Sequence, residues 1–370
     1  MVSVLIVEDS PSMALLLQEI FRQAGLYVAG TAHDGKEAVA LTERLHPDVI
    51  TMDVRMPGMD GIEATRLIME RAPTPIVVVS AALDDPELHI SFRAFAYGAV
   101  AVVEKPPSPN HAGFAAASRQ LIETVRAMAG VRVIRRRQNG SPPATPPAAE
   151  APAPAVPQAP PASPLSAAPP ARKPGPAPKL LAIAASTGGP QALAVLLGGL
   201  PDTFRLPIVV VQHISPGFVG GLTEWLTGCC RLRCSVARDG QPLLPGHVMF
   251  APDNVHLEVD TEGPLLVATL SSRPPVVRHR PSATPLFDSV ARTCGARAIG
   301  LVMTGMGCDG TDGLRHMHER GALTLAQSPG DCVVPNMPQA AVDAGVVDEV
   351  LPLAQLPGRL VAAQAALQES

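Results

Sequence analysis

The sequence has few aromatic residues and no excess of positive charge. Phenylalanine, tryptophan and tyrosine make up 3% of its 370 residues, and the formal net charge is −4 at pH 7. Lysine and arginine (29) do not exceed aspartate and glutamate (33), so the chain lacks the positive field that holds a phosphate backbone without sequence preference. Nucleic acid is therefore not an expected partner. The hydrophobic residues, 46% of the chain, are mainly alanine, valine and leucine, which is typical of parallel sheets covered by helices.

The sequence also lacks a zinc-type cysteine pattern, a secretory signal and a membrane span. Its six cysteines match no zinc-binding spacing, and residues 1–7 contain no basic stretch followed by an apolar core. The one long uncharged stretch, residues 180–201, has a Ser-Thr-Gly-Gly-Pro turn in its middle, which predicts a strand, a turn and a helix. We therefore expect a cytoplasmic protein with reduced cysteines and no direct membrane insertion.

Proline, in contrast, is abundant, and its excess is concentrated in one segment. Residues 138–178 contain 15 prolines and 12 alanines with almost no aliphatic side chain, so this segment cannot bury a core. A chain of this length can form more than one domain. We predict a first domain at residues 1–125, a Pro/Ala-rich linker at residues 126–178 that is disordered from residue 138, and a second domain at residues 179–370.

Short apolar runs alternate with helical patterns in both domains. The first domain has runs at residues 2–7, 28–31, 49–52, 76–80 and 100–103 and helical patterns at 13–24 and 35–45, the second opened by Asp34 as N-cap. The second domain has runs at residues 180–185, 208–212, 298–303 and 323–326 and a helix at 191–197. This alternation predicts a doubly wound parallel sheet in each domain. Residues 248–252 and 256–270 instead indicate shorter, hairpin-type strands.

Charged and polar side chains follow the predicted strands of the first domain. Glu8 and Asp9 follow the first strand and Asp53 follows the third. Because the carboxyl ends of parallel strands meet at one edge, we expect these carboxylates to lie together and to hold a hard cation such as Mg²⁺. Ser80 and Lys105, at the ends of the fourth and fifth strands, could hold the oxygens of an incoming phosphoryl group. The pattern predicts phosphoryl transfer to Asp53, although each carboxylate taken alone could be only a helix cap.

These residues lie in motifs that resemble the receiver domain of response regulators. The chain reads Val-Leu-Ile-Val-Glu-Asp-Ser at residues 4–10, Asp-Val-Arg-Met-Pro-Gly-Met-Asp-Gly at 53–61 and Glu-Lys-Pro at 104–106. The resemblance covers about residues 1–125 and implies a flavodoxin-like fold in which Asp53 takes phosphate from a histidine kinase. It further implies Asp9, Asp53 and the Arg55 backbone carbonyl as Mg²⁺ ligands, Glu8 acting through water, and Ser80 and Lys105 as readers of the phosphorylated state. Val102 departs from the family, where many members carry an aromatic switch residue.

In the second domain a serine, a histidine and an aspartate each follow a predicted strand. Ser186, His213 and Asp309 can therefore meet at one edge of one sheet. A serine hydroxyl needs a base within reach, and the base needs a carboxylate that fixes its tautomer. Gly188 and Gly189 permit a tight turn that leaves helix-start amides free for a developing oxyanion. Taken singly, the turn could be a helix cap or an anion cradle, His213 a structural histidine and Asp309 a turn residue.

The second domain resembles the catalytic domain of the chemotaxis protein-glutamate methylesterases, the CheB family. The motifs are Ala-Ala-Ser-Thr-Gly-Gly-Pro at residues 184–190, Val-Gln-His at 211–213, Arg-His-Arg-Pro-Ser at 278–282 and Met-Thr-Gly-Met-Gly-Cys-Asp-Gly at 303–310. The resemblance covers about residues 179–365 and implies a Rossmann-like fold with an added β-hairpin. It implies hydrolysis of glutamate γ-methyl esters on chemoreceptors to glutamate and methanol, and deamidation of receptor glutamines, without metal or organic cofactor.

The same resemblance implies a role for each residue of the serine site. Ser186 would attack the ester, His213 would move the proton, Asp309 would orient the imidazole, Thr187 would support His213 and the Met306 amide would help to hold the oxyanion. The chain departs from the family at residues 328–329 and 335–336, so the resemblance leaves receptor preference and deamidation open. We interpret residues 278–284 as a groove wall.

Two other functions remain open from the residues alone, and one hypothesis concerns regulation. The second domain could be a response-regulator output domain that only binds, although it lacks a basic helix-turn-helix pattern, or a serine hydrolase acting on another ester or amide. In the family the unphosphorylated receiver blocks the esterase. A long linker lowers the effective concentration of one domain at the other, so we expect that block to be weaker here or to depend more on the contact between the domains.

Overall fold

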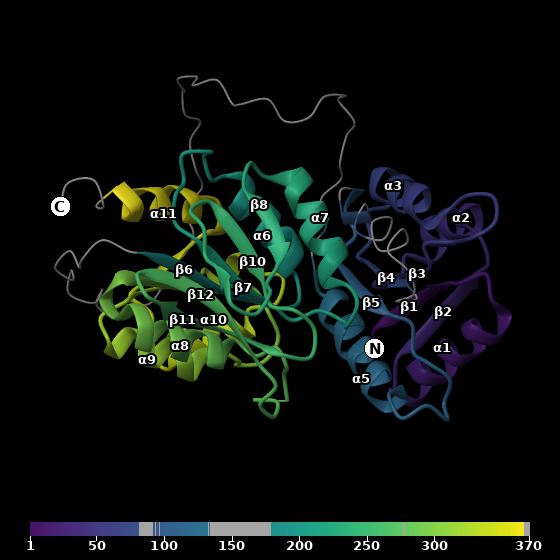
Figure 1. Ribbon diagram of the computed structural model, residues 1–370. Helices are drawn as coiled ribbons and strands as arrows, with labels where there is room; N and C mark the ends of the chain where they lie inside the picture. The colour runs from purple at the N-terminus through teal and green to yellow at the C-terminus, as the bar shows by residue number, and fades with distance from the viewer. Residues whose placement is uncertain are drawn as a thin grey trace, which may run out of the picture.

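The protein is described by a computed structural model over residues 1–80, 97–131, 179–276 and 278–365, with the single positions Phe92, Ala94, Phe95 and Val133. Two α/β domains lie next to each other, each with its own parallel sheet (Figure 1). Most of the predicted linker lies outside the described residues, and with it the prediction of disorder from residue 138.

The N-terminal sheet has five parallel strands in the order β2-β1-β3-β4-β5. The strands are β1 (Ser3–Val7), β2 (Tyr27–Ala32), β3 (Val49–Met52), β4 (Ile76–Ser80) and β5 (Ala101–Glu104). The helices with described bounds are α1 (Pro11–Gln23), α2 (Gly35–Leu45), α3 (Gly61–Arg71) and α5 (Phe114–Met128). This strand order is flavodoxin-like, which confirms the predicted fold class. Helix α5 continues to Met128, past the predicted domain boundary at residue 125.

Burial explains the central strands of this domain, and helix capping explains where three of its helices begin. Every residue of β3 and β4 is buried, as expected for strands covered by helices on both faces. Ser10, Asp34 and Asp60 precede α1, α2 and α3, and their side chains accept hydrogen bonds from amides of the first helical turn. The predicted N-cap Asp34 is confirmed. The starts of these helices therefore lie at the carboxyl edge of the sheet, where the acidic residues also lie.

The C-terminal sheet has seven parallel strands in the order β15-β14-β13-β6-β7-β10-β8. The strands are β6 (Leu180–Ala185), β7 (Ile208–Gln212), β8 (Arg233–Val236), β10 (His247–Phe250), β13 (Ala298–Val302), β14 (Leu323–Gln327) and β15 (Glu349–Leu351). The α-helices are α6 (Gly189–Gly198), α7 (Val219–Cys229), α8 (Ala283–Cys294), α9 (Thr311–Glu319), α10 (Asn336–Asp343) and α11 (Leu356–Ala365). Short 3-10 turns lie at Gly295–Arg297, Pro329–Asp331 and Leu353–Gln355. The predicted doubly wound parallel sheet is confirmed in this domain too.

One strand assignment from the sequence is wrong. Residues 248–252 were expected to form a hairpin-type strand, but β10 lies between β7 and β8 and pairs parallel with both. All four residues of β10 are buried, because the strand is covered on both faces of the large sheet. A run of only four such residues has no periodicity that separates a central parallel strand from a hairpin strand.

The predicted hairpin at residues 256–270 is present as a separate antiparallel layer. Strands β11 (His256–Glu262) and β12 (Leu265–Ser271) pair along their whole length, with Gly263 in the left-handed region at the turn. The short strand β9 (Gln241–Pro242) joins β12 at its other edge. Helix α8 packs against β11, where the Val259 amide donates to the Ser289 hydroxyl at 2.9 Å. This layer therefore fixes the position of α8.

The sequence predicts no membrane span, and the length and hydropathy of the helices can be compared with that prediction. Among the residues that the structure describes, every helix is too short or too polar to cross a membrane.

Candidate phosphorylation site and candidate active site

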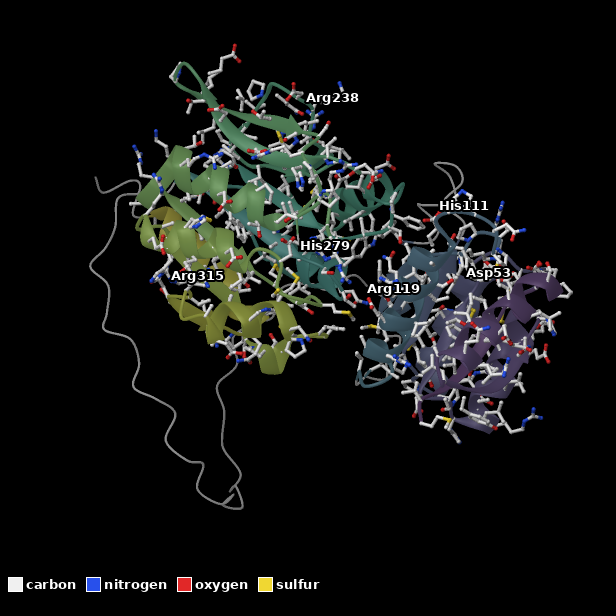
Figure 2. All side chains as sticks on the ribbon, turned by 90° about the horizontal axis from the view of Figure 1, so that it is seen from below. Asp53, His111, Arg119, Arg238, His279 and Arg315 are labelled. Carbon is white, nitrogen blue, oxygen red and sulfur yellow. The ribbon has the colours of Figure 1, made fainter. Side chains whose placement is uncertain are left out.

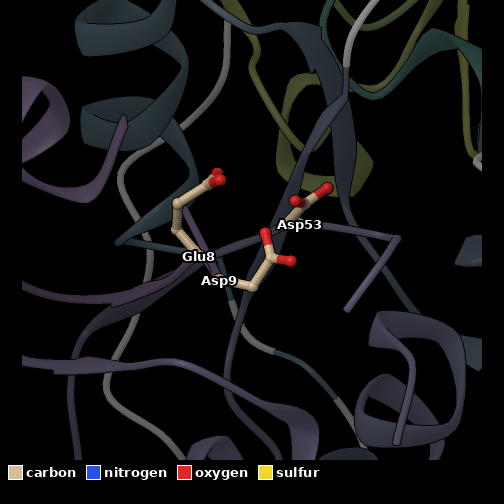
Figure 3. Close-up of side chains that lie close together, drawn as sticks. All are labelled: Glu8, Asp9 and Asp53. Atoms are coloured by element: carbon tan, nitrogen blue, oxygen red, sulfur yellow. The ribbon is translucent and has the colours of Figure 1, made fainter. Parts of the chain in front are cut away.

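Three carboxyl groups meet at the carboxyl edge of the N-terminal sheet. Glu8 and Asp9 follow β1 and Asp53 follows β3, and these strands are hydrogen-bonded neighbours. One carboxylate oxygen from each residue can be chosen so that the three oxygens lie within 4.8 Å of one another. Figure 3 shows the three side chains grouped together. Asp53 and Glu8 are buried, whereas Asp9 is exposed. The predicted acidic cluster is therefore present, because the parallel register brings the ends of β1 and β3 together.

Lys105 links two of these carboxylates. Its Nζ lies 2.7 Å from Asp53 Oδ2 and 3.1 Å from Glu8 Oε1. Burial raises the pKa of Glu8, and the hydrogen bond from Lys105 only partly opposes that change. Burial alone would lower the pKa of Lys105, but its hydrogen bonds to Asp53 and Glu8 raise it above the ordinary value. The Lys105 ammonium therefore holds Asp53 and Glu8 together at this edge.

The donor set of this cluster fits a hard divalent cation. Carboxylate oxygens are the ligands that Mg²⁺ prefers, and three carboxyl groups each offer an oxygen here within 4.8 Å of the others. Arg55 lies in the loop after Asp53, and its amide donates to Asp53 Oδ1 at 3.3 Å. Ser80 ends β4 and is buried, and its carbonyl accepts a hydrogen bond from the Lys105 amide at 2.9 Å. The residues predicted around Asp53 thus lie on one edge.

Ser186 and His213 lie side by side at the carboxyl edge of the C-terminal sheet. They follow the adjacent strands β6 and β7, and the His213 amide donates to the Ala185 carbonyl at 2.9 Å. The Gln212 side chain holds this edge, because its Nε2 donates to the carbonyls of Ser186 at 2.7 Å and His213 at 2.8 Å. Ser186 is 9% exposed. Within the described ranges no hydrogen bond joins its hydroxyl to His213.

Asp309 and His213 form a buried ion-pair-type contact. Asp309 is 2% exposed, and its Oδ2 lies 2.8 Å from His213 Nε2. Burial alone would raise the pKa of Asp309, but hydrogen bonds from His213, Ser282 and the Ala283 amide lower it to about 2. An ionised carboxylate can only accept, so Nε2 carries the imidazole proton. His213 Nδ1 is buried and has no hydrogen-bond partner among the described residues.

The start of α8 supplies further donors to Asp309. The Ser282 hydroxyl donates at 2.6 Å and the Thr284 hydroxyl at 3.1 Å to Oδ1, and the Ala283 amide donates at 2.7 Å to Oδ2. The Ser282 amide in turn donates to the buried His256 at 3.2 Å. The interpretation of residues 278–284 as a groove wall therefore missed their contact with Asp309. A serine before a helical pattern is an N-cap signal, but nothing in the sequence pairs that cap with Asp309.

His279 covers one face of the His213 imidazole. The two rings are stacked, with centroids 4.0 Å apart and an interplanar angle of 7°. Burial, and then the neighbouring His213, lower the pKa of His279 to about 4, so its ring is neutral at neutral pH. Two backbone hydrogen bonds between His279 and Val276 hold the segment. Figure 2 shows His279 in the C-terminal domain and Asp53 in the N-terminal domain. The motif at residues 278–282 includes His279, but the sequence did not predict its contact with His213.

Close backbone approaches shape the turn after Ser186. Gly188 is in the left-handed region at φ 78°, and a Cβ there would lie 2.6 Å from Val333 Cβ. A Cβ on Gly305 would lie 2.8 Å from Ser186 Cβ. Thr187 lies in this turn and its carbonyl accepts from the Thr304 hydroxyl at 2.9 Å, but within the described chain no hydrogen bond joins Thr187 to His213. At Gly188 and Gly305, therefore, the packing around the turn leaves no room for a side chain.

The N-terminal domain packs close to this active-site edge. Ser215, two residues after His213, accepts hydrogen bonds from the Glu104 amide at 3.4 Å and from Gln120 Nε2 at 3.3 Å. Met306 and Val333 pack against the core cluster under α5 of the N-terminal domain. On α7, Trp225 stacks on Phe92 with centroids 6.3 Å apart. The contact between the two domains therefore lies within two residues of His213.

Comparison with protein families gives a separate result for each domain. Residues 4–112 match the response regulator receiver domain, and residues 181–360 match the CheB methylesterase domain. Together with the acidic edge and the serine edge, these matches define the class: a response regulator joined to a hydrolase domain.

Individual relatives place the chain within one family. It is 46% identical over 361 residues to "Protein-glutamate methylesterase/protein-glutamine glutaminase 4" of Myxococcus xanthus (strain DK1622), covering 97% of this chain and 96% of that protein. It is 44% identical over 352 residues to "Protein-glutamate methylesterase/protein-glutamine glutaminase 3" of Anaeromyxobacter dehalogenans (strain 2CP-C), covering 95% and 96%. The crystal structure of the Thermotoga maritima CheB methylesterase catalytic domain is 34% identical and has a TM-score of 0.49. The match covers 50% of this chain and 98% of that structure. The chain belongs to the CheB methylesterase family.

Proposed function

We propose that the protein is a phosphorylation-controlled protein-glutamate methylesterase. It hydrolyses glutamate γ-methyl esters on chemoreceptors to glutamate and methanol, and it also deamidates receptor glutamines. The observation that carries the proposal is the buried His213–Asp309 pair beside Ser186, with His213 Nδ1 left as a free base. Relatives that align along nearly the whole chain carry the methylesterase and glutaminase names, which supports the substrate class.

The proposed reaction passes through an acyl-enzyme. His213 Nδ1 takes the Ser186 proton as the hydroxyl oxygen attacks the ester carbonyl, and Asp309 stabilises the imidazolium that forms. The proton then passes to the leaving methoxide, which departs as methanol, or to the leaving amine of a glutamine, which departs as ammonia. A water molecule, activated by the same imidazole, hydrolyses the acyl-enzyme and restores Ser186. The hydrolysis uses the chain's own hydroxyl, imidazole and carboxylate.

The turn amides near Ser186 and the Met306 amide are the proposed oxyanion donors. Met306 lies in the loop between β13 and Asp309, and Gly305 approaches Ser186 closely enough to exclude any side chain. Backbone amides held in this way need no reorganisation when negative charge develops on the carbonyl oxygen. Thr187 is proposed to support the site through its place in the same turn, where Thr304 holds its carbonyl.

In the receiver domain, Asp53 is the proposed phosphoryl acceptor and a histidine kinase the proposed donor. Mg²⁺ would be held by Asp9, Asp53, the Arg55 carbonyl and, through water, Glu8, and would neutralise charge on the phosphoryl oxygens. Asp53 attacks phosphorus with a carboxylate oxygen as the P–N bond of the kinase phosphohistidine breaks and its imidazole leaves, while Lys105 and Ser80 donate hydrogen bonds to the transferred group. Lys105 now bonds to Asp53 directly, so phosphorylation must change its partner.

Phosphorylation is proposed to act through the contact between the domains. Lys105 is next to Glu104, whose amide donates to Ser215, and Ser215 is two residues from His213. A shift of the β5 end therefore reaches the active-site edge by a short path. The proposed partners are the histidine kinase and the cytoplasmic domains of methylated chemoreceptors, so we place the action of the protein in the cytoplasm.

Methanol release from methylated receptor membranes tests the proposed activity. Ser186→Ala should abolish release, whereas Ser272→Ala, the same change at an exposed serine just after β12, should leave the rate unchanged. Native protein that releases no methanol but hydrolyses simple esters would favour another serine hydrolase. Native protein with no hydrolysis at all would favour an output domain that only binds.

A further inference from the structure

Two thiols touch where α7 ends and β8 begins, outside both sites described above. Cys230 caps the C-terminus of α7 and Cys234 lies in β8, and their Sγ atoms are 3.8 Å apart. The described residues include all six cysteines, and this is the one pair whose sulfurs are in contact. Cys234 is buried and Cys230 is partly exposed, so a small molecule can reach Cys230 first.

The local chain geometry holds the two sulfurs together. Residues 231–233 form a short connection whose central residue, Leu232, is buried. The Leu232 carbonyl accepts from Cys230 Sγ at 3.2 Å and lies 4.0 Å from Cys234 Sγ, so both thiols converge on one oxygen. The Cys230 amide donates to Leu226 at 3.0 Å, which anchors the helix end. The sulfurs are in van der Waals contact, and they must approach to about 2.05 Å to form a disulfide bond.

The two thiols differ in acidity. The hydrogen bond from Cys234 lowers the pKa of Cys230 to about 7, and the same interaction, together with burial, raises the pKa of Cys234. Elsewhere, burial raises the pKa of Cys294 to about 11 and of Cys332 to about 12. Cys230 is thus the cysteine with the larger thiolate fraction near neutral pH, and a thiolate is the nucleophilic form.

We propose that Cys230 and Cys234 form a reversible redox-modification site, in which a hydroperoxide oxidises the pair to a disulfide. The Cys230 thiolate attacks the peroxide oxygen, the O–O bond breaks, and a sulfenic acid and one water (or alcohol) form with uptake of a proton. Cys234 then attacks the Cys230 sulfur, the S–O bond breaks, and a second water leaves. Two thiols are oxidised and one peroxide is reduced, and a small dithiol reverses the step by exchange.

The site lies on the helix that contacts the receiver domain. Trp225, one residue before Leu226 on α7, packs against Phe92 and Phe95 of the receiver domain with ring centroids 6.3 and 5.4 Å apart. A bond from the end of this helix to β8 ties it to the C-terminal sheet. The modification therefore acts on the catalytic-domain side of the domain contact, without touching Ser186 or Asp53.

Peptide mapping of the full-length protein tests the proposal. The reduced protein is treated with hydrogen peroxide, the remaining thiols are alkylated, and the chain is cleaved with trypsin. Arg231 and Arg233 lie between the two cysteines, so the disulfide should appear as two linked peptides that separate on reduction. Cys230→Ser should remove the linked peptides and slow the loss of the Cys234 thiol at least about tenfold. Cys234→Ser should leave a sulfenic acid on Cys230 that a dimedone probe captures, and Cys229→Ser is the matched control that keeps the cross-link.

The mapping of the unaltered protein alone can overturn the proposal. If peroxide oxidises the exposed Cys229 or Cys308 while Cys230 and Cys234 remain alkylatable, the two thiols are only packed apolar groups. If Cys230→Ser keeps native circular dichroism and Cys234 is still oxidised at the native rate, Cys230 is not the attacking thiol.

Discussion

The two domains use the same edge of the same kind of sheet but balance their charges differently. At the receiver edge, three carboxyl groups lie together, and Lys105 donates hydrogen bonds to two of them, Glu8 and Asp53. At the catalytic edge, the single carboxylate of Asp309 receives hydrogen bonds from one imidazole, two hydroxyls and one amide. The comparison shows that carboxyl groups are clustered at the first edge, whereas the carboxylate at the second edge is matched by hydrogen-bond donors.

The largest effect should follow loss of the Asp309 carboxylate. Asp309→Asn removes the charge that stabilises imidazolium, so we expect kcat for methanol release to fall about 10³- to 10⁴-fold. Asp312→Asn, at the exposed partner of Arg315 on α9, is the matched control and should have no effect. A fall of less than about tenfold would mean that His213 does not depend on Asp309.

The next largest effect should follow loss of the Asp53 carboxylate at the receiver edge. Asp53→Asn removes the proposed phosphoryl acceptor, so we expect a small-molecule phosphodonor to lose all stimulation of methanol release while the basal rate stays within about twofold. Asp34→Asn is the matched control, because asparagine also caps a helix. Stimulation that survives Asp53→Asn would exclude Asp53 as the regulatory site.

The low pKa of Asp309 should appear in acid stability. Its pKa in the folded protein, about 2, lies below the ordinary 3.8, so its contribution is complete above about pH 4 and is lost as pH falls toward 2. We expect about 2 kcal/mol of pH-dependent stability from this group. Denaturant unfolding of the native protein and of Asp309→Asn, measured at several pH values, should give curves of free energy against pH that converge below pH 4. Parallel curves would contradict the assignment.

The stacked histidine should have a moderate effect. His279→Ala uncovers one face of His213, so we expect kcat to fall about tenfold with little change in KM. His279→Phe keeps a flat ring and should restore most of the rate. Equal losses in both variants would show that the imidazole of His279 acts by some means other than stacking.

The smallest effect should follow loss of a hydrogen bond between the two domains. Gln120→Ala removes one of the two donors to Ser215, and we expect the basal rate of the unphosphorylated protein to rise about twofold. Gln18→Ala, on α1 and bonded to Thr31 within the receiver domain, is the control. A rate that does not change would indicate that this hydrogen bond does not hold the domains together. The expected weakening of autoinhibition by the long linker stays a prediction.

Local sequence patterns predicted much of the fold. The runs at residues 49–52, 76–80, 180–185 and 208–212 coincide with β3, β4, β6 and β7, because continuous apolar runs bounded by turns are typical of buried parallel strands. The positions of Ser186, His213 and Asp53 followed from the same patterns. The interpretation of β10 failed because a short apolar run does not reveal its neighbours in a sheet.

Residues distant in sequence account for what the patterns missed. Ser282 and Thr284 lie 27 and 25 positions from Asp309, and the Arg-Pro-Ser segment signals a helix start without saying which carboxylate it meets. The stack of His279 on His213 and the contact of Ser215 with Gln120 likewise join separate elements. No periodicity in the chain encodes such pairs.

The amino-acid sequence by itself determined which side chains follow the strands, and hence which chemistries can gather at each sheet edge, because strand periodicity is local and parallel strands end together. Only the tertiary structure decided which imidazole nitrogen faces Asp309, which ring covers His213 and which two thiols touch. Those details depend on how helices and loops far apart in the chain pack against one another, and an atom-to-atom contact is a property of that packing.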